Sequence, residues 1–180
     1  MDTVDQTTRS KIMASVGQKN TGPEMALRST LHRRGLRYRL HDRNLPGSPD
    51  LVFPRFKAVI FVHGCYWHAH DCYRGTKPKS RQRFWDEKFQ ANQHRDARNV
   101  ERLVARGWRV LTVWECAIKG KTAKPSDMLA QKIDVWLKGK RTIGTIDGKD
   151  SPRQKVVEHL GKATIARDRH RDGHSGKVAS

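Results

Sequence analysis

Histidine and cysteine, two side chains that commonly bind zinc, are concentrated in residues 63–72, which read HGCYWHAHDC. Within this segment, Cys65, His70 and Cys72 have a spacing that suits one zinc ion. Cys116, the only other cysteine of the chain, could complete a tetrahedron and so attach the segment to the rest of the fold. The alternative that stays open is a group of three small buried thiols without a metal.

A carboxylate could carry hydrolytic chemistry beside that segment. Asp50 follows a serine–proline pair, which keeps the chain extended and puts the carboxylate at the start of a strand. If the next strand returns through a tight bend, Asp50 lies roughly opposite Phe61 and near the strand end at Val62 and His63. The carboxylate, one main-chain carbonyl and water molecules could then hold Mg²⁺ for phosphodiester hydrolysis.

The zinc assignment leaves two histidines of the segment, His63 and His68, without a role. A neutral imidazole near a phosphate can deprotonate the attacking water, and a protonated one can stabilise the charge of the transition state. Two alternatives stay open. Asp50 could simply cap a turn, and either histidine could be a core residue or a partner that orients a metal ligand.

Three large aromatic side chains accompany this chemistry. Tyr66 and Trp67 lie inside the same segment, and Trp85 opens a polar stretch that follows it. Rings in a basic loop can wedge between base steps and stack on unpaired bases. Packing of the loop and helix against the sheet is the alternative, for which Phe84 and Phe89 are better candidates than Trp85.

The charge of the chain indicates its class of partner. Lys and Arg number 37 against 18 Asp and Glu, which gives a formal net charge of +19 and predicts a polyanionic partner. Charge alone does not separate DNA from RNA, ribosome or anionic membrane. The sequence has no long apolar run and no secretory signal, and its three cysteines make an odd set, so we expect a cytoplasmic protein without a disulfide framework.

The hydrophobic pattern predicts an α/β domain with the order helix, three strands, helix, strand, helix. Thr21, Pro23 and Glu24 form a capping-box start for the first helix. The apolar run 58–62 suits a strand buried on both faces. The expected helices cover 22–34, 81–106 and 126–137, the expected strands 36–41, 50–53, 58–62 and 108–114, and an irregular loop 64–80.

Composition divides the chain into three parts. Residues 1–20 form a polar, basic arm whose Arg9 and Lys11 are expected to contact the partner. Residues 21–138 form the folded domain. Residues 139–180 are rich in Gly, Lys, Arg, Asp and His with few large apolar side chains, so we expect a mostly disordered basic tail.

Several motifs resemble the very short patch repair (Vsr) mismatch endonucleases. They are residues 45–50 (LPGSPD), 59–72 and 107–116 (GWRVLTVWEC), with 8–11 (TRSK) near the start. The resemblance covers about residues 5–138. It implies a restriction-endonuclease-like α/β fold with three layers, a mixed central sheet and a zinc-stabilised loop, together with Mg²⁺-dependent hydrolysis.

The resemblance also implies roles for individual residues. Asp50 corresponds to the metal-binding aspartate, His68 to the general base and His63 to the neighbouring catalytic histidine. Glu24 and Asp96 correspond to acidic residues near the active site, although the capping box already explains Glu24. The zinc ligands would be Cys65, His70, Cys72 and Cys116, and the rings that intercalate beside a mispair would be Tyr66, Trp67 and Trp85.

The sequence departs from the family pattern at two positions. Val62 stands where a threonine is familiar, so only its main-chain carbonyl could bind Mg²⁺ there. Tyr66 stands where a phenylalanine is familiar, which keeps the ring and adds a hydroxyl. The Glu-x-Lys pair of ordinary restriction enzymes is absent from the strand end at residues 62–64, which favours histidine chemistry.

The resemblance therefore predicts an enzyme that nicks double-stranded DNA 5′ to the thymine of a T:G mispair, which arises from deamination of 5-methylcytosine. We expect a bacterial, nucleoid-associated monomer that works with a linked cytosine-5 methyltransferase and with repair-synthesis or mismatch-repair proteins. One alternative is a restriction or homing nuclease of the same fold that needs no mispair. Another is a zinc-stabilised DNA-binding module without catalysis.

Overall fold

The computed structural model describes residues 19–149 of the 180-residue chain. The predicted elements are present with small shifts at their ends. Arg9 and Lys11 of the predicted arm lie outside the described residues. The elements in chain order are α2 (Gly22–Arg33), β1 (Arg39–Leu40), β2 (Leu51–Phe53), the 3₁₀ turn η1 (Pro54–Phe56), β3 (Ala58–His63), α3 (Gln82–Ala105), β4 (Arg109–Trp114), α4 (Glu115–Ile118), α5 (Ser126–Lys138) and β5 (Ile143–Ile146).

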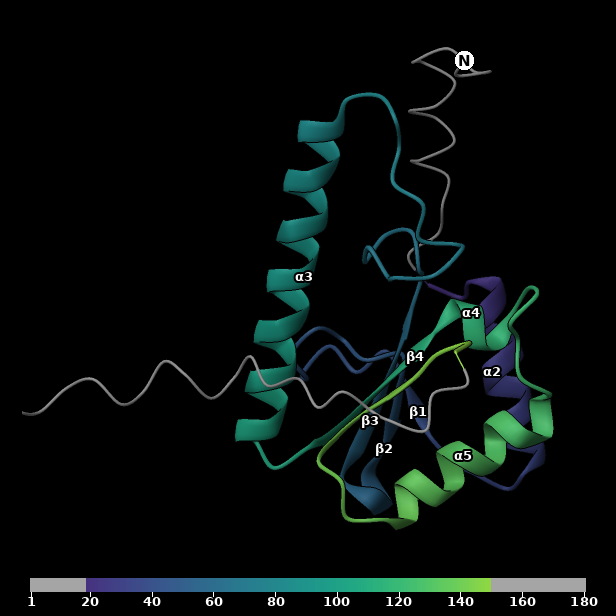
Figure 1. The fold of residues 1–180 in the computed structure, drawn as a ribbon. Coiled ribbons are helices and arrows are strands. Elements are labelled where there is room, and N and C mark those ends of the chain that lie inside the picture. The colour runs from purple at the N-terminus through teal and green to yellow at the C-terminus, as the bar shows by residue number, and fades with distance from the viewer. Residues whose placement is uncertain (1–18, 150–180) are drawn as a thin grey trace, which may run out of the picture. The chain divides into compact units, whose positions relative to one another are not determined.

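The five strands form one mixed sheet in the order β1-β2-β3-β4-β5 (Figure 1). β1, β2 and β3 pair antiparallel, whereas β3, β4 and β5 pair parallel. The two parallel connections run through helices, as crossovers of this kind require: α3 joins β3 to β4, and α5 joins β4 to β5. The prediction of an α/β domain with a mixed central sheet is therefore confirmed.

The sheet has a separate hydrophobic core on each face. Leu27 and Leu31 of α2 pack in one core with side chains of α5, and Leu103 of α3 packs in the other. β3 serves both cores, because Ile60 points into the first and Val59 into the second. This alternation confirms the expectation that the apolar run 58–62 is buried on both faces, and it gives three layers with the sheet in the middle.

β5 corrects the predicted end of the folded domain. The segment assigned to the tail contains this strand, and Ile143–Ile146 pairs with Val110–Val113 of β4. Its sequence IGTI is too short and too polar at its flanks to show a strand pattern. Close packing explains the glycine at residue 144, since a Cβ atom there would lie 2.4 Å from Nε1 of Trp136. The folded domain therefore continues at least to residue 149.

The prediction of Phe84 as a core residue is wrong, because its side chain is 45% exposed. Phe89 is buried as expected. The short helix α4 was not predicted, since four residues carry no periodicity. Among the described residues, no helix is long and apolar enough to span a bilayer.

Candidate active site and metal centre

Asp50 lies at the start of β2, where the antiparallel pairing brings it beside the end of β3. Leu51 pairs with Ile60, so the preceding residue faces Phe61 as the sequence indicates. The main-chain N–H of Val62 donates to Oδ2 of Asp50 over 2.7 Å. Burial raises the pKa of the Asp50 carboxyl, although this hydrogen bond and the nearby charges partly offset it. A cation at this carboxylate would remove that cost of burial.

His68 is held by a partner from α3. Its Nδ1 atom lies 2.5 Å from Oδ2 of Asp96. Burial by itself would raise the pKa of Asp96, but the hydrogen bond and the positive charges around it lower the pKa overall. The ionised carboxylate therefore accepts the Nδ1 proton, which leaves Nε2 of His68 as the nitrogen that can take a proton from water.

His63 stacks on His68 with ring centroids 3.9 Å apart and planes only 7° from parallel. Burial, and then the neighbouring His68, lower the pKa of His63 to about 3. His63 is therefore neutral near neutral pH. His63, His68 and Asp96 also offer ligand atoms that lie within 4.8 Å of one another.

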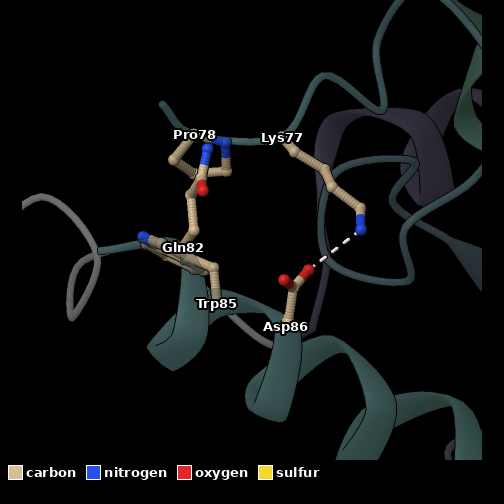
Figure 2. A pocket seen from close by; sticks show the side chains of 5 residues that line it. All are labelled: Lys77, Pro78, Gln82, Trp85 and Asp86. Atoms are coloured by element: carbon tan, nitrogen blue, oxygen red, sulfur yellow. Dashed lines mark hydrogen bonds and ion pairs between the residues drawn. The ribbon is translucent and has the colours of Figure 1, made fainter. Parts of the chain in front are cut away.

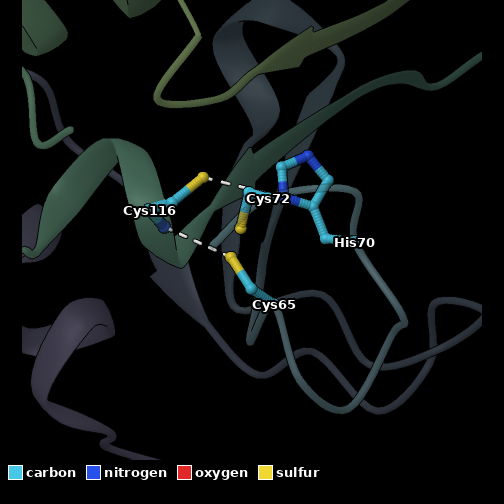
Figure 3. Close-up of side chains that lie close together, drawn as sticks. All are labelled: Cys65, His70, Cys72 and Cys116. Carbon is cyan, nitrogen blue, oxygen red and sulfur yellow. Dashed lines mark hydrogen bonds between the residues drawn. The ribbon is translucent and has the colours of Figure 1, made fainter. Parts of the chain in front are cut away.

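The cysteines and one histidine gather at the end of β4, as the sequence indicates (Figure 3). The potential ligand atoms of this group all lie within 4.8 Å of one another, the separation that a tetrahedral zinc site needs. Burial raises the pKa of the Cys65 and Cys116 thiols, so a cation is required to keep them as thiolates. The donor set and its spacing fit zinc. The members are Cys65, His70, Cys72 and Cys116.

One residue separates the two histidines that serve different sites. Ala69 has a φ of +48°, the left-handed conformation that an alanine rarely adopts. This turn sends His68 toward Asp96 on α3 and His70 toward Cys116 after β4. The ring of His70 also stacks on Trp114 with centroids 4.0 Å apart.

A family model and a curated relative place this chain in the same protein family. The family model for the DNA mismatch endonuclease Vsr matches residues 1–74. The DNA mismatch endonuclease Vsr of Escherichia coli (strain K12) is 42% identical over 146 residues, which are 81% of this chain and 94% of the relative. This chain belongs to the Vsr DNA mismatch endonuclease family.

Other relatives of this Vsr-family chain are nicking enzymes. The type II nicking enzyme V.XorIIP of Xanthomonas oryzae pv. oryzae is 52% identical over 110 residues, 61% of this chain and 81% of the relative. V.NmeAIP of Neisseria meningitidis serogroup A is 42% identical over 113 residues, 63% of this chain and 81% of the relative. The chain is therefore an endonuclease of this family, and DNA is its substrate class.

The three aromatic side chains singled out in the sequence lie together in this Vsr-family domain. Tyr66 is 5.2 Å from Trp67 and 5.4 Å from Trp85 between ring centroids, and all three rings are partly exposed. The ammonium of Lys88 lies 5.7 Å from both tryptophan rings. Tyr66 also contacts the buried ring of Phe89. The cluster is thus both packed against α3 and presented to solvent, with a cation beside it.

Sequence reasoning missed His41, which links two acidic residues of the site. Its Nε2 lies 3.2 Å from Oε1 of Glu24, and its Nδ1 lies 3.9 Å from Oδ1 of Asp50. The guanidinium of Arg28 donates to both Glu24 and His41. Burial and the Arg28 charge lower the pKa of His41. No sequence motif marks His41, and its left-handed φ of +46° is visible only in the structure.

Glu24 is almost fully buried, at 2% exposure, and its two oxygens have different partners. Oε2 accepts from the main-chain N–H of Thr21 over 3.3 Å, as the capping-box prediction requires. Oε1 is bound by Arg28 and faces His41. The structure therefore brings Glu24 to the rear of the Asp50 site while keeping its role at the start of α2.

A hollow near the start of α3 lies outside this site (Figure 2). Nζ of Lys77 and Oδ1 of Asp86 form an ion pair of 2.9 Å across it, and Trp85 lies on one side. Neither Asp50 nor the histidines line it. A DNA duplex is read from a protein surface, so no deep pocket is needed for the substrate.

Proposed function

We propose that this chain nicks double-stranded DNA 5′ to the thymine of a T:G mispair and so starts very short patch repair. The observation that carries the proposal is the Asp50 carboxylate at the head of β2 in a site shared with the His68–Asp96 pair. The end of β3 connects the two groups, because the N–H of Val62 binds Asp50 and the ring of the next residue, His63, stacks on His68. A carboxylate and a positioned imidazole are the two groups that metal-assisted phosphodiester hydrolysis requires.

Asp50 would hold Mg²⁺, with the main-chain carbonyl of Val62 as a second protein ligand. In an extended strand the N–H and C=O of one residue face the same neighbour, and the Val62 N–H already points to Asp50. Bound Mg²⁺ would neutralise charge on the scissile phosphate and on the groups that attack and leave it. Valine at this position supplies the carbonyl as well as threonine would.

His68 would accept the proton of the attacking water at Nε2, because Asp96 fixes its proton at Nδ1. His63 would support the His68 ring by stacking and stay neutral, as its low pKa requires. Glu24 would act through His41, which it faces, and would not touch the DNA. In this proposal His68 is the proton acceptor, Asp96 the carboxylate that orients it, and His63 its stacking partner.

Structural zinc in the cysteine–histidine group would fix the loop that carries His68, Tyr66 and Trp67. Residues 64–80 contain no helix or strand that could hold their side chains in place. The zinc would therefore determine the position of both the general base and the rings. The three-layer arrangement with a catalytic carboxylate at a strand start supports a fold of the restriction-endonuclease type.

Mismatch dependence is supported by the partly exposed rings of Tyr66, Trp67 and Trp85. Intercalation costs unstacking energy, and a mispair lowers that cost. Lys88 beside the rings would neutralise phosphate at the same place. Because several relatives are named only as type II nicking enzymes, nicking that depends on sequence rather than on the mispair is the second candidate.

A nicking assay tests the proposal. Duplexes that differ only in T:G or C:G at one position are incubated with Mg²⁺, and both strands are followed on denaturing gels. We expect a single nick 5′ to the mispaired thymine, and loss of it in Asp50→Ala and His68→Ala. Equal cutting of both duplexes would overturn mismatch dependence, cleavage of both strands would favour the restriction-type alternative, and full activity of Asp50→Ala would overturn the mechanism.

The same assay, varied in context, addresses the partners. A preference for T:G within a cytosine methylation sequence would support cooperation with a cytosine-5 methyltransferase, and it would also define where repair synthesis must begin. We propose that the enzyme acts as a monomer, since one chain contains the complete constellation of Asp50, His63, His68 and Asp96. Sedimentation of the active protein tests this.

A further inference from the structure

The end of β5 lies against the cysteine–histidine group, where neither the sequence pattern nor the family motifs place a functional residue. Asp147, Gly148 and Lys149 follow directly after Ile146, the last residue of the strand. Each of the three contacts a zinc-type ligand or the loop that carries the ligands. These contacts are additional to the four ligand positions themselves.

Asp147 lies behind the imidazole of His70. Its Oδ2 atom is 3.7 Å from Nε2, while Nδ1 on the other side of the ring lies 3.7 Å from Sγ of Cys116. A carboxylate at Nε2 keeps the ring proton there and leaves Nδ1 as the lone pair that faces the sulfurs. It also makes Nδ1 a stronger ligand, because the carboxylate polarises the ring.

Gly148 contributes its main chain. Its N–H donates to Sγ of Cys116 over 3.3 Å, and the N–H of Cys116 in turn donates to Sγ of Cys65 over 3.4 Å. Such donors stabilise sulfur in the thiolate form. Only glycine fits here, since a Cβ atom at residue 148 would lie 2.3 Å from Oγ1 of Thr122 and 2.8 Å from the Cys116 carbonyl oxygen.

Lys149 completes the contacts. Its ammonium bonds to Oδ2 of Asp71 over 2.7 Å, and Asp71 lies in the loop between the ligands His70 and Cys72. The pair is exposed, so its contribution to stability is small. Three thiolates exceed the charge of one Zn²⁺, and Lys149 offsets the negative charge of Asp71, which would otherwise add to that excess.

We propose that Asp147, Gly148 and Lys149 are an outer layer of the zinc centre, which orients His70 and stabilises the thiolates, and that β5 thereby attaches the metal site to the sheet. This inference rests on the structural zinc of the proposed function. It assigns the end of β5 a role in metal retention and not in contact with DNA.

Full-length protein is used for the test, and zinc content is first measured in the wild type by mass spectrometry. Transfer of zinc to a chromogenic chelator is then followed for wild type, Asp147→Ala, Asp147→Asn and Glu101→Gln. Glu101 is an exposed residue of α3 and controls for the loss of one negative charge. Cobalt-substituted proteins are compared by absorption, because the thiolate-to-cobalt bands report whether all four ligands remain.

We expect zinc affinity to fall about 10- to 100-fold in Asp147→Ala, with the cobalt bands retained. Asp147→Asn should fall between this variant and wild type, since an amide oxygen presents a partial negative charge to Nε2 in place of a full one, and Glu101→Gln should equal wild type. Wild-type zinc retention in both Asp147 variants would overturn the inference alone. A wild-type protein that contains and binds no zinc would overturn the structural zinc and this inference together.

Discussion

Nδ1 of His68 and Oδ2 of Asp96 lie 2.5 Å apart although 28 residues separate them in the chain. The contact joins an irregular loop to the middle of α3. A histidine on a loop has many orientations, and this carboxylate selects one of them. The helix therefore supplies the order that a loop-borne proton acceptor lacks.

The first prediction concerns this pair. Asp96→Asn should reduce single-turnover nicking of a T:G duplex by about 100-fold or more, because the amide no longer fixes the Nδ1 proton of His68. Affinity for the duplex should change little, since Asp96 faces the histidine. The measurement combines single-turnover kinetics with a binding titration without Mg²⁺.

Asp86→Asn is the matched control, because Asp86 is also a carboxylate of α3 but pairs with exposed Lys77. It should nick at the wild-type rate. If Asp96→Asn were equally active, His68 would not depend on this contact and the assignment of the general base would fail.

The second prediction concerns His41, which connects buried Glu24 and Arg28 to Asp50. Arg28 can only donate, so its contact with Nε2 of His41 leaves the ring proton on Nδ1, on the side of Asp50. Loss of this orienting group should raise the Mg²⁺ concentration for half-maximal nicking about 10-fold. Mg²⁺ titrations of the nicking rate measure the effect.

Two substitutions separate positioning from folding at His41. Asn tolerates the left-handed backbone but is too short to span from Arg28 to Asp50, whereas Gln has the longer reach. His41→Asn should keep thermal stability and lose Mg²⁺ affinity, and His41→Gln should recover part of it. Unchanged Mg²⁺ dependence in a stable His41→Asn protein would exclude the positioning role.

The third prediction concerns the aromatic cluster. Trp67→Ala should lower the ratio of T:G to C:G cutting about 5- to 150-fold, because stacking on a base contributes about 1–3 kcal/mol. Phe84→Ala removes another exposed ring at the start of α3 and serves for comparison. An equal loss in Phe84→Ala would mean that ring exposure, and not the Tyr66–Trp67–Trp85 arrangement, determines discrimination.

The fourth prediction is a pH dependence of stability. His63 has a folded pKa of about 3 and an unfolded value of 6.5, so the unfolded chain binds one more proton between these values. The free energy of unfolding therefore falls as the pH decreases from 6.5 toward 3. Between pH 7.5 and pH 5.5 this one group should contribute a loss of about 1.4 kcal/mol.

Urea denaturation of wild type and His63→Asn at pH 7.5 and pH 5.5 measures this contribution. The variant should lose less stability on acidification than the wild type, by about the amount stated for one histidine. An identical loss in both proteins would show that His63 is protonated in the fold. The remaining acid sensitivity is common to both proteins and cancels in the comparison.

The sequence predicted those parts of the site that depend on local spacing. The tight bend between residues 53 and 58 determines the register of two strands, and that register alone brings Asp50 beside Val62. The ligand-type residues Cys65, His70 and Cys72 are close in sequence, so a short loop suffices to bring them together. The capping residues of α2 predicted its start for the same reason.

The sequence could not predict contacts that depend on tertiary packing. The family resemblance names Asp96, but no local pattern separates it from the other acidic residues of this long helix, and only the packing of α3 shows that His68 is its partner. Arg28 and His41 look like ordinary surface residues until α2 and the loop before β2 meet. β5 has too few apolar residues for its sequence to predict a strand, and parallel pairing with β4 stabilises it.

The zinc-type ligands Cys65 and His70 flank the candidate catalytic and aromatic residues 66–68, and each kind faces a different neighbour. The segment therefore presents two sets of side chains to two different parts of the fold. Insertion or deletion of one residue between Cys65 and His70 would shift both sets at once. Exchange of a single ring at Tyr66 or Trp67 leaves the zinc-type ligands in place, whereas grafting the whole loop replaces both sets.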